Sequence, residues 1–172
     1  MQSRFSHIRA MLAYGVSAGL LTAVASVAYL LFRANQEVEV LQTPVPKNSL
    51  GFQDYTYTAR SAEYFPYLVT LPADVIILVF VTIAAFLSAR HTRDRFAGFG
   101  AALIAFFCGF VLYATASALV ATYLLEPAVP FGDLSLVGST VSALAICFAP
   151  VLVLAAGCAA WAISWALPEY RQ

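Results

Sequence analysis

The hydrophobic pattern divides the chain into four long apolar segments, which cover about residues 10–32, 72–89, 96–125 and 139–167. Apart from Asp74, these segments hold no Asp, Glu, Lys or Arg. A run of about 20 apolar residues is long enough to cross the hydrocarbon core of a bilayer as a helix. The pattern therefore predicts an all-α, multi-pass integral membrane protein, a four-helix transmembrane bundle that forms a single membrane domain over residues 1–172.

Composition points the same way. Hydrophobic residues make up 62% of the chain and charged residues only 10%, whereas soluble domains carry about 25% charged residues. The deficit indicates that most of the surface faces something other than water. The formal net charge is zero, and the sequence offers no basic patch of the kind that binds nucleic acid.

The third segment, Phe96–Leu125, separates small residues from aromatic ones when it is plotted as a helix. Small residues let helix backbones approach closely in lipid, whereas the aromatic face suits acyl chains or a partner protein. The first segment, with a GxxxG motif, and the fourth segment also carry small residues on one face. We therefore predict helix packing at Gly15, Gly19, Gly98, Ala102, Ala105, Gly109, Ala145 and Ala149, and partner or lipid contact at Phe99, Phe106 and Phe110.

The longest predicted loop covers residues 33–71 and changes from polar to aromatic along its length. Its alternation over residues 54–58 is typical of a short strand. Two interpretations of the aromatic residues stay open, an interfacial belt and a docking surface for another subunit. Both predict partner or lipid contact for Tyr55, Tyr57 and Tyr64. The other connections, 90–95 and 126–138, are short.

The distribution of charge predicts the orientation. The N-terminal head, the 90–95 loop and the C-terminal tail hold six arginines against two acidic residues. The 33–71 and 126–138 loops, counted with Asp74, hold three basic residues against seven acidic ones. By the positive-inside rule, both termini are expected to be cytoplasmic and the long first loop extracytoplasmic.

Candidate chemistry is sparse. His7 and His91 fall in the predicted cytoplasmic head and loop, and the cysteines fall inside apolar segments, so we expect a non-enzyme without a metal or cofactor, with bound lipids compatible with its surface. Asp74 is a candidate ion site, because ionisable groups in membrane spans are often functional. The competing interpretation places Asp74 in the first turn of a helix, where it favours the helix dipole. Pro150 predicts a kink in the fourth span.

The layout of four spans, internal termini and a long first external loop resembles the claudin-type and MARVEL tetraspans. Claudins carry one Trp and two Cys in the first loop, and residues 33–71 contain neither residue type. The leading hypothesis is a non-catalytic accessory, assembly or scaffolding subunit of a larger complex, which acts by helix packing and by contacts of its first loop. Its expected partners are other integral membrane subunits or copies of itself. The alternatives are a claudin-like or MARVEL-like organiser that self-associates, and a small transporter or channel that uses Asp74.

Overall fold

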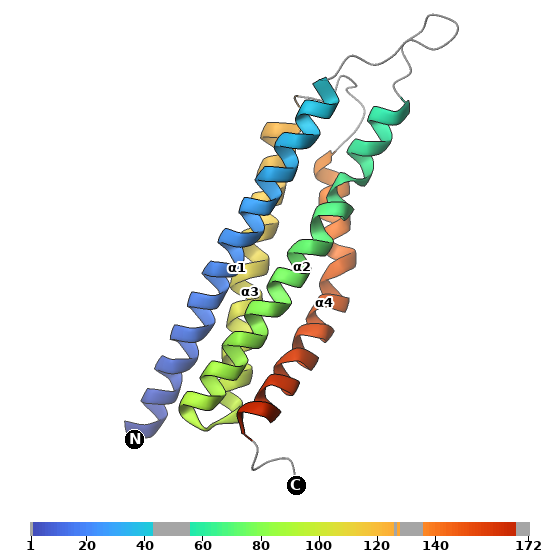
Figure 1. Ribbon diagram of the computed structural model, residues 1–172. Helices are drawn as coiled ribbons and strands as arrows, with labels where there is room; N and C mark the ends of the chain where they lie inside the picture. The colour runs from blue at the N-terminus through green and yellow to red at the C-terminus, as the bar shows by residue number, and fades with distance from the viewer. Residues whose placement is uncertain (1, 43–55, 126, 128–135, 168–172) are drawn as a thin grey trace, which may run out of the picture.

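The computed structural model describes residues 2–42, 56–125, 127 and 136–167 (Figure 1). Its elements are α1 (Gln2–Gln42), α2 (Thr56–Thr92), α3 (Arg95–Val120), the π-helical turn η1 (Ala121–Leu125) and α4 (Leu136–Ala166). The four α-helices each contain a stretch that is long and apolar enough to cross a membrane. The predicted all-helical architecture with four candidate spans is therefore confirmed.

The helices form an elongated up-and-down bundle (Figure 1). α2 and α3 pack against each other and form its centre, and α1 and α4 each pack against both of them from opposite sides. α1 and α4 make almost no contact with each other. The start of α1, the α2–α3 turn and the end of α4 lie together at one end of the bundle.

The first connection differs from the prediction. We expected residues 33–71 to form a loop, but α1 extends to Gln42 and α2 begins at Thr56. α1 can continue because residues 33–42 contain helix-forming Glu, Gln and Leu and lack Gly and Pro. The predicted strand is wrong for residues 56–58, which form the first turn of α2. Residues 54 and 55 lie outside the described residues.

The α2–α3 turn is tighter than the predicted 90–95 loop, since only Arg93 and Asp94 lie between the two helices. Arg93 adopts a positive φ of 53°, and the Asp94 carboxylate caps α3 by accepting a hydrogen bond from the Phe96 amide at 2.9 Å. The second Asp94 oxygen lies 3.3 Å from Nδ1 of His7. This turn therefore ties the start of α1 to the junction of α2 and α3.

Close backbone approach holds the bundle together. A Cβ placed on Gly19 of α1 would lie 2.6 Å from Cys108 Cβ of α3. Gly98 of α3 faces α2 and α4, since its added Cβ would lie 2.9 Å from Ala89 Cβ of α2 and 2.9 Å from Ile163 Cγ1 of α4. Small side chains thus set the helix spacing, as is usual in lipid. The predicted packing residues of α1 and α3 are all buried: Gly15, Gly19, Gly98, Ala102, Ala105 and Gly109.

Candidate functional site

Polar side chains from all four helices are buried in the half of the bundle away from the α2–α3 turn. Thr70 and Asp74 lie one turn apart on α2, and Tyr113 and Ser117 lie one turn apart on α3, so each pair shares a helix face. Asp74 retains only 6% of its exposure. The set, called here the inner polar cluster, comprises Ser26, Thr70, Asp74, Tyr113, Ser117 and Thr140.

A small cavity of about 10 Å³ lies within the inner polar cluster, with Thr70, Tyr113, Ser117 and Thr140 among its lining residues. Leu30, one turn after Ser26, also lines it. A volume of this size holds about one water molecule. Two cluster atoms lack a hydrogen-bond partner within the described structure, namely Ser26 Oγ and Asp74 Oδ1. By its volume and its hydroxyl-bearing lining, the cavity can accommodate one small polar guest.

Asp74 lies within the bundle, as its helix face predicted. The helix-dipole interpretation is wrong, because α2 begins at Thr56 and Asp74 lies far beyond its first turn. The sequence analysis does not identify the hydroxyl-bearing members of the inner polar cluster. The sequence feature that could have revealed them is the four-residue spacing of Thr70 and Asp74, and of Tyr113 and Ser117, in otherwise apolar segments. The π-helical turn η1 contributes Ala121 and Leu125 to the cavity wall, and the sequence pattern did not predict it.

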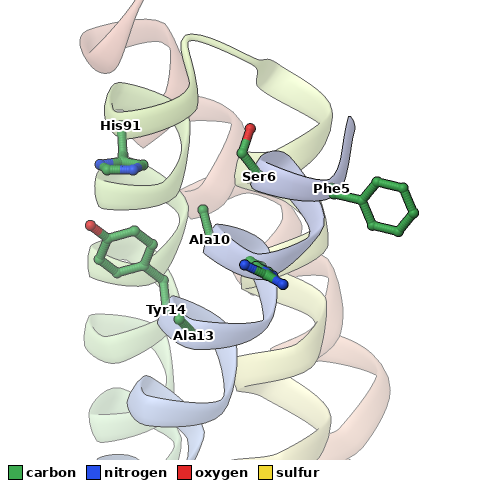
Figure 2. A pocket seen from close by; sticks show the side chains of 7 residues that line it. Phe5, Ser6, Ala10, Ala13, Tyr14 and His91 are labelled. Atoms are coloured by element: carbon green, nitrogen blue, oxygen red, sulfur yellow. The ribbon is translucent and has the colours of Figure 1, made fainter. Parts of the chain in front are cut away.

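A second, larger hollow lies between the start of α1 and the end of α2, at the end of the bundle that holds the α2–α3 turn. It has a volume of about 670 Å³. Figure 2 shows the Tyr14 hydroxyl of α1 pointing toward the His91 ring of α2, and the two ring centroids are 5.9 Å apart. We call this hollow the basic groove; its lining residues are Phe5, Ser6, Arg9, Ala10, Ala13, Tyr14 and His91.

The phenylalanines of α3 do not form one outward wall. Phe106 is only 1% exposed. Its ring centroid lies 5.8 Å from that of Phe110 on the same helix and 5.8 Å from that of Phe148 on α4. Phe110 is partly buried, whereas Phe99 is 37% exposed. The placement of Phe106 on the outer surface was wrong, because the α4 ring Phe148 packs over it.

The predicted packing residues of α4 face outward. Ala145 and Ala149 are exposed, while Ala155, Ala159 and Ala162 are buried against α2 and α3. α4 carries small residues on several sides, so its sequence could not tell which side faces inward. We call the exposed side the outer face of α4; it consists of Ser142, Ala145, Ala149, Val153, Ala156 and Ala160.

The structure describes only some of the remaining predicted positions. Tyr55 lies outside the described residues, and Tyr57 and Tyr64 belong to the first turns of α2, where side-chain positions are not described. Pro150 lies on the exposed side of α4, and the helix continues on both sides of it. Within the described residues, no group of three or more His, Cys, Asp or Glu side chains is placed to hold a metal ion.

No family model, no curated protein and no solved structure matches this chain. The function therefore has to be argued from the residues and their arrangement.

Proposed function

We propose that this protein is a non-catalytic accessory, assembly or scaffolding subunit of a larger membrane complex. In this proposal, the outer face of α4 contacts a transmembrane helix of a partner subunit. The observation that carries it is the exposure of small residues along α4. The most apolar 18-residue stretch of α4 is 28% buried, against 44% for that of α2, so α4 is the least covered of the four candidate spans.

Small residues gain little from lipid. Acyl chains pack against any apolar side chain, whereas an alanine or serine allows another helix backbone to come close and increases van der Waals contact. Inside the bundle, the small residues of α1 and α3 serve this purpose. Ala145 and Ala149 have the same character but are exposed. A partner helix seated on the outer face of α4 would use them in the same way.

The proposal includes an orientation with both termini on the cytoplasmic side. Arg9, Arg90, Arg93 and Arg95 gather at the end of the bundle where α1 begins and α2 meets α3, with Asp94 as their acidic neighbour in the turn. Basic residues in short connections favour retention on the cytoplasmic side. Because the outer face of α4 belongs to a candidate membrane span, the proposed partner is another integral membrane protein rather than a soluble one.

Purification from the native membrane tests this function. The wild-type protein, extracted in polymer-bounded lipid discs, is expected to carry a second integral membrane protein at a fixed molar ratio. Ala149→Leu enlarges the outer face of α4 at an exposed position and should reduce that ratio at least several-fold. Ala28→Leu, at an exposed small residue on the diagonally opposite α1, is the matched control and should leave the ratio unchanged.

Two results would contradict the proposal. One is a wild-type protein that is recovered alone as a monomer. The other is an equal loss of the partner in Ala149→Leu and Ala28→Leu, which would remove α4 from the interface. Recovery of a complex made only of this chain would instead favour the self-associating tetraspan organiser.

A small transporter or channel is a second candidate function, and the inner polar cluster is the observation that favours it. A buried carboxyl oxygen without a hydrogen-bond partner is expensive in a membrane protein and often marks an ion or proton pathway. Cation flux into liposomes that contain the purified protein tests it. Flux that is absent, or that is unchanged by Asp74→Asn, would exclude this role for Asp74.

A further inference from the structure

The basic groove is lined by the cationic side chain of Arg9. Among the described side chains, none forms a hydrogen bond or an ion pair with Arg9. The carboxylate of the α2–α3 turn, Asp94, accepts a hydrogen bond from the Phe96 amide and lies 3.3 Å from His7. The Arg9 guanidinium is therefore available for an external anion. Its planar fork of N–H donors matches phosphate oxygens better than a single amino group does.

The rest of the groove combines polar and apolar surface. The Tyr14 hydroxyl and the His91 ring supply hydrogen-bonding groups on one side (Figure 2), and Ala10 and Ala13 supply a small apolar floor along α1. The volume of about 670 Å³ lies within the usual range of about 300–1,000 Å³ for ligand sites. Such a groove fits a ligand with an anionic head and an apolar body.

From this geometry we infer that the basic groove binds the headgroup of an anionic phospholipid, with Arg9 on the phosphate and the acyl chains directed along the Ala10–Ala13 side of α1. A free phosphate would satisfy Arg9 but would leave the apolar floor uncovered. A lipid covers both. Four arginines at this end of the bundle (Arg9, Arg90, Arg93 and Arg95) add a long-range attraction to a negatively charged leaflet. This inference is independent of the proposed contact at α4.

Native mass spectrometry of the full chain in lipid discs tests the inference. The discs contain phosphatidylcholine with an increasing fraction of phosphatidylglycerol. We expect the wild-type protein to retain one phosphatidylglycerol in preference to phosphatidylcholine. Arg9→Gln should weaken that retention about tenfold or more, because a charge-assisted hydrogen bond is lost. Arg93→Gln removes the same charge from the neighbouring turn, outside the groove, and should change retention less than about twofold.

A second variant tests the shape of the site without altering its charge. Ala13→Leu fills the groove and should also reduce retention of phosphatidylglycerol, whereas Ala28→Leu should not. Equal weakening by Arg9→Gln and Arg93→Gln would show diffuse surface attraction and overturn the inference. Equal retention of the two lipids would overturn it as well. Displacement of the lipid by millimolar inorganic phosphate would assign the site to a soluble anion instead.

Discussion

The close contact between α1 and α3 gives the sharpest test of how the bundle is held together. Gly19→Ala adds one methyl group whose carbon would lie 2.6 Å from Cys108 Cβ and 3.2 Å from the Ala105 carbonyl oxygen. Favourable carbon–carbon contacts are found at about 3.5–4.0 Å, so the two helices must separate by about 1 Å. Overpacking of this kind costs about 1–3 kcal/mol.

The same substitution also removes a glycine from a helix, which stabilises the helix by about 1 kcal/mol. Gly157→Ala separates the two effects, because nothing lies within 4 Å of a Cβ placed on Gly157. The helix-propensity gain is common to both variants and cancels in their difference. Gly19→Ala should therefore be less stable than Gly157→Ala by about 1–3 kcal/mol.

Reversible unfolding in mixed detergent micelles measures this difference. Cys108→Gly in the Gly19→Ala background removes the opposing carbon and should recover about 1 kcal/mol of coupling energy relative to the two single variants. If Gly19→Ala is as stable as Gly157→Ala, α1 and α3 do not approach as closely as described, and the reasoning about small residues fails.

Three further changes test other parts of the bundle by the same unfolding assay. Phe106→Ala should cost about 2–4 kcal/mol because it leaves a cavity beside α4, whereas Phe107→Ala, at a 47% exposed ring, should cost less than about 1 kcal/mol; equal losses would contradict the placement of Phe106. Asp94→Ala removes the cap on the Phe96 amide and should cost about 1 kcal/mol, most of which Asp94→Asn should restore. Ser26→Ala removes a buried hydroxyl without a hydrogen-bond partner and should stabilise the protein by up to about 1 kcal/mol; a clear loss of stability would show that the hydroxyl is bonded.

The sequence was sufficient for the number of candidate spans, and the small residues that it singled out on α1 and α3 are buried. Long uncharged segments leave little choice in lipid. The GxxxG spacing of Gly15 and Gly19 predicts close packing without a particular partner, and the structure places both residues against α3. The polarity of residues 33–42 predicts a loop. Polarity indicates where a helix extends beyond the hydrophobic region, but it does not indicate where the helix ends. The helix propensity of these residues lets α1 continue to Gln42.

The inward side of α4 could not be predicted for a different reason. Small residues occur on several sides of this helix, so periodicity alone assigned Ala145 and Ala149 to the core although Ala155 and Ala159 occupy it. The inner polar cluster was equally hidden. Only the three-dimensional structure shows that Asp74, Tyr113 and Ser117 lie together, since they come from distant parts of the chain.

Site-specific photo-cross-linking in the native membrane tests the proposed role of α4 most directly. A photoreactive amino acid at Ala149 lies on the outer face of α4, and one at Val24 of α1, which is 68% exposed, reports on the opposite side of the bundle. We predict a single product from Ala149, with the mass of this chain plus a different integral membrane protein, and no such product from Val24. Cross-linking from Ala149 to lipid alone would contradict the account.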